Sequence, residues 1–298
     1  MDNQKSALVG NVLLLSFATT IWGIGFVATK WTLVLLDPFW SQSFRFLTAA
    51  ILGLPFLFYK NTFFKKDSLL KEACVGGILI SITLILQTIG LTHTTVAKSG
   101  FITTLYVLFI PIISTIMLKK KYKKHLWGLV LLSLVGMALL CNFKISEFNI
   151  GDKQTLVCSL VAALHILYIG QIAHKIKSPI EFNFLQNIVV AFFSVLTAII
   201  FHKKMNASFL FDWQSRVFYG VLFLGVFSSM MAFSIQIVAQ KKIPVHIAGL
   251  VFLLESPLAA FFGYLFLDEK LAMMNIVGAI LILFSVLLVP FVPKEVTV

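Results

Sequence analysis

The chain has 298 residues, of which 59% are hydrophobic and 12% charged, and its formal net charge is +12. Soluble domains carry about 25% charged residues, so this composition excludes an ordinary soluble protein and indicates an integral membrane protein. The basic residues gather at the ends of apolar runs, where they orient a membrane protein and meet anionic lipid headgroups. The net charge therefore gives no support to nucleic-acid binding.

Ten apolar runs of about 20 residues each, the length that spans a bilayer, follow one another along the chain. They predict membrane helices over about 11–30, 39–59, 72–91, 97–118, 126–142, 154–173, 182–201, 216–239, 246–267 and 272–292. The connections between the runs are short and leave no room for a separate soluble domain. The predicted fold class is an all-α integral membrane protein.

The second and seventh runs are the weakest, because the second contains Arg45 and the seventh begins with Asn183, Gln186 and Asn187. Charge bias supports keeping both, since cytoplasmic loops collect Lys and Arg. With ten spans and a cytoplasmic N-terminus, most basic residues fall in cytoplasmic segments, and KKKYKKH directly follows the fourth run. We therefore predict a multi-pass protein of the cell (inner) membrane with both termini in the cytoplasm.

Catalytic and metal-binding motifs are absent from the sequence. The three cysteines, Cys74, Cys141 and Cys158, are scattered and lack metal-ligand spacing. There is no H-E-x-x-H pair, no Gly-rich phosphate loop and no Ser/His/Asp pattern. We expect no cofactor, no metal site and no catalytic residues.

The two halves of the chain show a common pattern. The fourth run ends in LYVLFIPIISTIMLKK and the ninth contains LLESPLAAFFGYLFLDEK; aligning Pro111 with Pro257 places Phe109 opposite Glu255. Trp22 of the first run falls opposite His165 of the sixth. This predicts a five-helix unit in residues 1–145 and another in 146–298. Because five is odd, the second unit enters the membrane from the opposite face, as in the inverted repeats of many secondary transporters.

Several segments resemble the EamA family of the drug/metabolite transporter superfamily. They are TTVAKSGFITTLYVLFIP, LDPFWSQSFRFLTAA, and LLESP followed by LDEKLAMMNIVGAILI. The resemblance covers nearly the whole chain. It implies ten transmembrane helices in two inverted five-helix repeats around a central cavity, and the export or exchange of small metabolites.

Glu255 is the first candidate for a functional residue. It lies about ten residues into its run, or about 15 Å along a helix that rises 1.5 Å per residue, which is near the bilayer midplane. A carboxylate at that depth could bind a cationic group or carry a proton. It could equally be a structural acceptor beside the turn that Pro257 loosens. His165 reaches the same depth from the other side; a lone histidine is more often a packing residue, but the matching depth with Glu255 makes a shared polar site the alternative.

Other polar or aromatic residues within the runs are weaker candidates for the wall of a cavity. Tyr168 shares a helical stripe with His165, and Trp22 lies in mid-span instead of at an interface, so that it is either cavity wall or core filler. The predicted lining residues beyond Glu255 and His165 are Trp22, Tyr168, Lys98 and Gln87.

A second group of residues is predicted to act as gate or framework. Arg45 lies near the outer end of its run, where it either extends to the interface or pairs with Asp268 or Glu269 to form an outer gate. Pro111 and Pro257 are expected to bend corresponding helices.

These features predict a secondary transporter that moves a small metabolite, either an amino acid or related compound or a drug-like molecule, by alternating access. Export is favoured; an importer of the same fold is the alternative, followed by an intramembrane enzyme or a channel. Since no ATP-binding motif is present, transport would run downhill or be coupled to an ion gradient. The expected partners are the substrate and the lipid bilayer, with the protein a monomer or weak homodimer.

Overall fold

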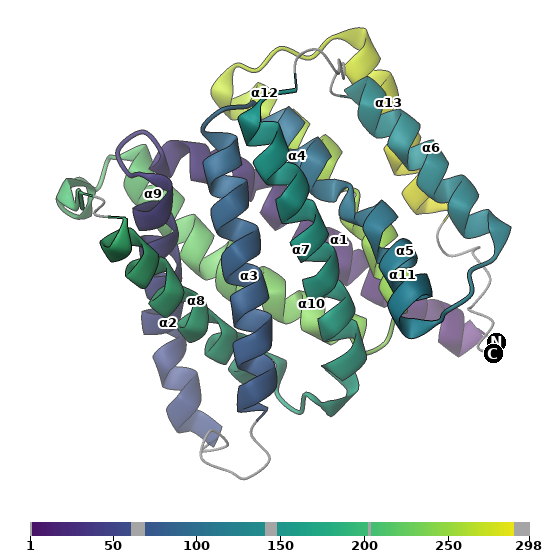
Figure 1. Ribbon diagram of the computed structural model, residues 1–298, viewed down its shortest axis with the longest axis horizontal. Coiled ribbons are helices and arrows are strands. Elements are labelled where there is room, and N and C mark those ends of the chain that lie inside the picture. Colours follow the sequence, from purple (N-terminus) through teal and green to yellow (C-terminus); the bar gives the residue numbers. More distant parts are fainter. Residues whose placement is uncertain (1, 61–68, 141–147, 202–203, 289–298) are drawn as a thin grey trace.

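The computed structural model describes residues 2–60, 69–140, 148–201 and 204–288, and these form helices joined by short turns (Figure 1). The elements are α1 (Asp2–Thr32), α2 (Pro38–Lys60), α3 (Leu70–Leu91), α4 (Val96–Thr104), α5 (Tyr106–Leu118), α6 (Lys124–Leu140), α7 (Ile150–Ile172), η2 (Ala173–Lys175), α8 (Pro179–Ile200), η3 (Ser208–Phe211), α9 (Arg216–Phe223), η4 (Leu224–Ala232), α10 (Phe233–Gln240), α11 (Val245–Phe252), α12 (Glu255–Leu267) and α13 (Met273–Leu287).

Each apolar range expected from the sequence is helical over most of its described length, including the two weakest, which form α2 and α8. Within the described residues, seven helical segments are long and apolar enough to cross a membrane. They are Leu8–Thr32, Leu70–Leu91, Val96–Leu118, Ile150–Lys175, Pro179–Ile200, Arg216–Gln240 and Val245–Leu267. Two further apolar helices, α6 and α13, are shorter. The chain is therefore an all-helical, multi-pass membrane protein.

Two of these segments are broken near their middle, and the two breaks are alike. The first segment is interrupted at Leu105, between α4 and α5, and the second at Leu253 and Leu254, between α11 and α12. After each break comes a helix of 13 residues. Each of these helices ends on a left-handed residue, Lys119 with φ 54° or Asp268 with φ 56°.

The matching helix ends set a register between the two broken segments. In that register Val96 corresponds to Val245, Gly100 to Gly249, and Tyr106 to Glu255. The backbone N–H of the residue after the left-handed one, Lys120 or Glu269, bonds the carbonyl of Ser114 in one segment and of Gly263 in the other, which also correspond. Local backbone geometry, not side-chain identity, makes the two segments equivalent.

The register expected from the prolines is therefore wrong, because Tyr106, and not Phe109, corresponds to Glu255. Pro257 lies in the first turn of α12, where backbone N–H groups have no intrahelical partner and a proline is tolerated. Pro111 lies inside α5, beyond the break. The two prolines occupy different positions in their helices, and the breaks precede both.

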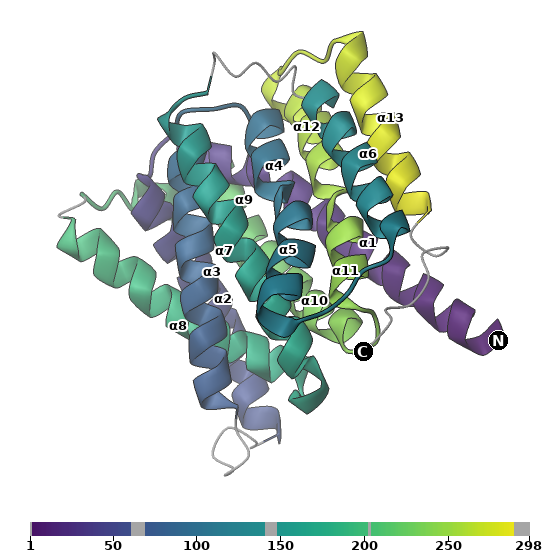
Figure 2. The same ribbon diagram turned by 45° about the vertical axis from the view of Figure 1, so that its right-hand side comes forward.

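The broken segments pack against each other in opposite directions. α4 lies along α12 and α5 lies along α11, an arrangement visible in both views (Figures 1 and 2). α1 packs on α12 and on α9, η4 and α10, while α7 packs on α3, α4 and α5. α2, α3 and α8 lie together on one side of this centre, and α6 and α13 form a pair on the other.

Small residues bring α6 and α13 close together. Gly136 faces Gly278 so tightly that a Cβ atom on Gly278 would overlap the carbonyl oxygen of Gly136 and the backbone of Leu140. Ser133 and Ser285 share a hydrogen bond of 2.8 Å between their hydroxyl groups in the same interface. Small residues and hydroxyl bonds of this kind hold helices together in lipid, where no hydrophobic driving force acts between them.

We expect Gly278→Ala to destabilise the protein by about 1–3 kcal/mol, the usual cost of overpacking, since the neighbouring atoms belong to backbone and cannot rotate away. Gly128→Ala is the matched control, because a Cβ there meets nothing within 4 Å. Thermal unfolding in detergent should show a lower midpoint for the Gly278 variant alone. Equal midpoints for the two variants would contradict the tight α6–α13 contact.

Candidate functional site

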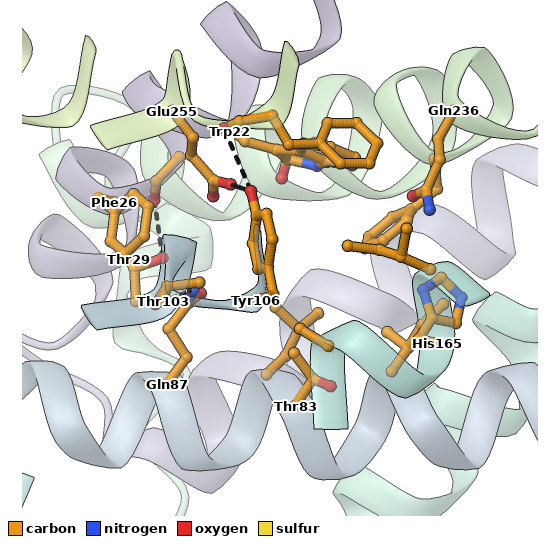
Figure 3. A pocket seen from close by; sticks show the side chains of 18 of the residues that line it. Trp22, Phe26, Thr29, Thr83, Gln87, Thr103, Tyr106, His165, Gln236 and Glu255 are labelled. Atoms are coloured by element: carbon orange, nitrogen blue, oxygen red, sulfur yellow. Dashed lines mark hydrogen bonds between the residues drawn. The ribbon is translucent and has the colours of Figure 1, made fainter. Parts of the chain in front are cut away.

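A cavity of about 70 Å³ lies where the two helix breaks meet (Figure 3). A water molecule needs roughly 10–15 Å³ by a comparable measure, so the cavity has room for a few waters. Its wall combines aromatic and polar side chains from both halves of the chain: Trp22, Phe26, Thr29, Arg45, Thr83, Gln87, Thr103, Tyr106, His165, Ser228, Phe233, Gln236, Phe252 and Glu255.

Glu255 and Tyr106 meet at the centre of this site. The Tyr106 hydroxyl lies 2.9 Å from Oε2 of Glu255 and 3.2 Å from the carbonyl oxygen of Phe252, a carbonyl next to the α11–α12 break. The dashed lines of Figure 3 mark these contacts. Glu255 is only 7% exposed. The two residues occupy corresponding positions at the starts of α12 and α5, so the two halves touch through equivalent residues.

One hydroxyl proton serves two acceptors at Tyr106, because a tyrosine has a single O–H donor. With an ionised Glu255, that proton goes to the carboxylate. With a protonated Glu255, the carboxyl donates to the Tyr106 oxygen, and the Tyr106 hydroxyl is released to the Phe252 carbonyl. The protonation of Glu255 is thus linked to a hydrogen bond at the helix break.

Arg45 is on another part of the cavity wall and is 3% exposed. Its Nε donates to the Ser229 hydroxyl and its Nη2 to the Ser228 hydroxyl, both at 2.8 Å. A guanidinium has five N–H donors, so donors remain for the cavity. Both sequence expectations for Arg45 are corrected: it does not extend to the interface, and Asp268 and Glu269 are not its partners.

The two serines that hold Arg45 belong to η4, a nine-residue π-helix. π-helices are rare and occur frequently at functional sites. Side chains from other helices bind its carbonyl oxygens: the Trp22 ring N–H lies 3.3 Å from that of Ser228, and the Asn183 amide lies 2.9 Å from those of Ser229 and Met230. The asparagine that weakened the seventh apolar run is therefore part of the support of Arg45.

His165, Trp22 and Gln87 also reach the cavity, as the sequence predicts for them. His165 is 5% exposed, and its Nε2 lies 3.4 Å from Nε2 of Gln186. The amide of Gln87 donates to the Thr103 hydroxyl at 3.2 Å. In Figure 3, His165 and Glu255 lie at opposite ends of the site, with Tyr106 between them.

Two predicted lining residues, Tyr168 and Lys98, are not on the cavity. Tyr168 packs against an apolar cluster that includes Ala73 and Phe182. Lys98 forms an ion pair with Asp152 of α7, with Nζ and Oδ2 2.7 Å apart. Depth along the helix places Tyr168 near the site, but it lies on a different side of the helix. Lys98 lies in the first turn of α4, near the end of its span.

Asp268 and Glu269 lie at the end of α12, away from Arg45. Asp268 is the left-handed residue that closes the helix. The carboxylate of Glu269 accepts the backbone N–H groups of Val96, at 2.8 Å, and Ala97, at 3.2 Å. Glu269 therefore joins α12 to the first turn of α4.

Sequence reasoning missed Tyr106. A signal was available, since a tyrosine in the middle of an apolar run is unusual; membrane tyrosines concentrate at the interfaces. The threonines Thr29, Thr83 and Thr103 gave no such signal, because hydroxyl groups often bond to their own helix backbone. Among the described residues, no three His, Cys, Asp or Glu side chains form a group that could hold a metal ion.

Membrane-spanning helices and a buried polar cavity between two broken helices define the class: a polytopic membrane protein with an internal polar cavity. Comparison with known proteins identifies the family. The sequence model of the EamA-like transporter family matches residues 10–142 and, a second time, residues 149–291. The chain belongs to that family.

Relatives of the chain are named as transporters in other organisms. An uncharacterized transporter of Archaeoglobus fulgidus is 30% identical over 92% of this chain and 84% of its own length. The uncharacterized transporter YoaV of Bacillus subtilis is 25% identical over 89% and 91% of the two chains. One solved crystal structure matches with a TM-score of 0.72 and 15% identity, covering 94% of this chain and 96% of the other. That likeness concerns the fold alone.

Removing the hydroxyl of Tyr106 should destabilise the protein. In Tyr106→Phe, Glu255 and the Phe252 carbonyl lose their donor in a buried site, which we expect to cost about 1–3 kcal/mol. Chemical unfolding in mixed micelles measures this loss. Tyr122→Phe is the control, since its hydroxyl bonds Ser114 at 2.9 Å outside the cavity, and we expect a smaller change. A Tyr106 variant as stable as the control would show that the hydrogen bonds of the Tyr106 hydroxyl do not stabilise the protein.

Proposed function

We propose that the protein is a secondary transporter that moves a small metabolite across the cell (inner) membrane by alternating access, with export the favoured direction. The observation that carries this proposal is the meeting of two broken helices at a buried polar cavity. Discontinuous helices at a midplane site are a recurring feature of secondary transporters, because the free helix ends bind substrates or coupling ions there.

The proposed architecture is ten transmembrane helices in two inverted five-helix repeats, with residues 1–145 in the first and 146–298 in the second. Three observations support it. The family model matches the chain twice. In both broken segments the helix after the break has 13 residues and ends on a left-handed residue. α4 packs on α12 and α5 on α11, as expected if a twofold axis in the membrane plane relates the halves.

The size of the cavity supports a moving mechanism. Ligand sites usually have volumes of about 300–1,000 Å³, whereas this one has about 70 Å³. A metabolite would need the helices to separate before it could enter. Movement of α4 and α5 relative to α11 and α12 would enlarge the cavity without breaking a continuous helix, since both segments are already interrupted.

The chemistry of the cavity wall suggests the substrate class. Arg45 offers donors for an anionic group, and Glu255 offers a carboxylate for a cationic group or a proton. Within the described residues Arg45 and Glu255 do not form an ion pair with each other within 4 Å, so a ligand could bridge them. An amino acid or related compound fits this arrangement, with aromatic walls for its side chain; a drug-like cation is the alternative. An importer of the same fold remains the second candidate for direction.

An intramembrane enzyme or a channel is the less favoured function. An enzyme of this kind would need several carboxylates or metal ligands at one depth, and Glu255 is the carboxylate on the described cavity wall. A channel would be expected to repeat its pore-lining groups in both halves, whereas Glu255 corresponds to Tyr106. We expect a monomer or weak homodimer.

Glu255→Gln should abolish transport or its pH dependence, because the variant keeps the shape of the side chain but cannot titrate or carry charge. The measurement is uptake and efflux of an amino-acid and drug panel in proteoliposomes, with and without a proton gradient. Glu72→Gln, at the start of α3 and away from the cavity, is the matched control. Parental transport with an unchanged pH profile would leave Glu255 with a purely structural role.

The proposed topology predicts that both termini lie in the cytoplasm. A reporter fused after residue 298 and one inserted between Lys120 and Lys121 should both report the cytoplasmic side, because Lys and Arg are retained there. A reporter inserted after Thr92 should report the outside and serves as the reference. A C-terminal reporter on the outer side would exclude an even number of spans and with it the inverted repeat.

A further inference from the structure

The first turn of α4 is bound by carboxylates from two other helices. Glu269, at the end of α12, accepts the N–H groups of Val96 and Ala97. Those groups have no partner inside the helix, and the helix dipole favours a negative charge beside them. Lys98, in the same turn, is paired with Asp152 of α7 at 2.7 Å. We call this region the α4–α12 end.

The register between the broken segments identifies the corresponding region, which we call the α5–α11 end. At this end the first turn of α11 takes the position that the first turn of α4 has at the other end. The residues after α5 likewise take the position of the residues after α12. Glu269 corresponds to Lys120, and Lys98 to Ile247. α11 starts after Pro244 and has no side-chain cap.

The chemistry of the two ends is therefore opposite. A lysine has three donors and no acceptor, so Lys120 cannot bind the backbone N–H groups at the start of α11. Its positive charge is also unfavourable beside a helix N-terminus, which carries partial positive charge itself. Corresponding backbone positions thus carry a carboxylate side chain, Glu269, at one end and a lysine, Lys120, at the other.

We propose that Glu269 is a latch that closes the α4–α12 end, and that the Lys120 side chain, which has no acceptor, leaves the corresponding α5–α11 end without this carboxylate latch, although Tyr122 contacts His246 there. The substrate-free transporter then rests with its α4–α12 end closed. This inference rests on the proposed alternating access. In the proposed topology the latched end faces outside and the unlatched end faces the cytoplasm, so that the resting protein is ready to receive a cytoplasmic substrate.

The test measures the opening of each end by distances between spin labels, in a background whose three native cysteines are replaced by alanine. Thr92 and Leu265 carry the labels at the α4–α12 end, and the corresponding residues Lys241 and Ile116 carry them at the other end. All four are exposed. Because the pairs correspond in register, their distances can be compared directly.

Glu269→Gln removes the charge and one of two acceptors, and should add a longer-distance population for the Thr92–Leu265 pair. Lys120→Glu should shorten the distances for the Lys241–Ile116 pair, since it supplies the missing acceptor. The exchange Lys120→Glu with Glu269→Lys should reverse the preference, opening the first end and closing the second, at unchanged net charge.

Asp268→Asn and Lys121→Glu are the charge-matched controls, each next to a tested residue, and both should keep the parental distances. Unchanged distances in Glu269→Gln, or the same change in Asp268→Asn, would overturn the latch, and so would an exchange variant that keeps the parental preference. The distances are read without substrate. Shifted distances in a protein that transports nothing would therefore support the latch and contradict the proposed function. Unshifted distances in a protein that transports its substrate would contradict the latch and support the proposed function.

Discussion

The constraint on which this structure depends is that lipid offers no hydrogen-bond partner to a backbone group. A chain that interrupts two membrane helices near their middle exposes N–H and carbonyl groups where they are most costly. Here the breaks are placed against each other, and the Tyr106 hydroxyl from one lies by Glu255 and the Phe252 carbonyl of the other. The cavity lies where the breaks make this polar contact, and the proposed transport would use the same place.

Charge in the cavity obeys the same constraint. Arg45 is held by two serine hydroxyl groups on a π-helix, and the carbonyl oxygens of that helix are in turn bound by Trp22 and Asn183. Truncating a polar group in such a network leaves its partner unsatisfied, which costs more than the bond itself contributes. Asn183 and Asn187 of the seventh apolar run are therefore structural support for a charge on another helix, and not an interruption of a membrane span.

The sequence predicts the helices well because a bilayer demands about 20 apolar residues for each crossing, and that length is visible without knowing any contact. It also predicts part of the site, since depth along a helix places Glu255, His165 and Trp22 near the midplane. Depth does not give the direction of a side chain around the helix, so Tyr168 was misplaced, while Lys98 lies in the first turn of α4, away from the depth of the cavity. The π-helix has no periodic signature, and so the serine partners of Arg45 could not be foreseen. Pro111 and Pro257 both lie in the broken segments, but both come after the break, so neither gave its position.

Two nearly equivalent halves create a problem that only side-chain differences can solve. If the ends of a transporter were chemically identical, the two closed states would have the same free energy, and neither would be the resting state. A population ratio of ten requires about 1.4 kcal/mol, and hydrogen bonds to charged groups contribute roughly 1.5–3 kcal/mol each in buried settings. The two bonds that Glu269 accepts at the start of α4, with no acceptor possible at Lys120, are of sufficient size to set such a preference. In the proposed mechanism the repeat would supply the two states, and its departures from symmetry would decide between them.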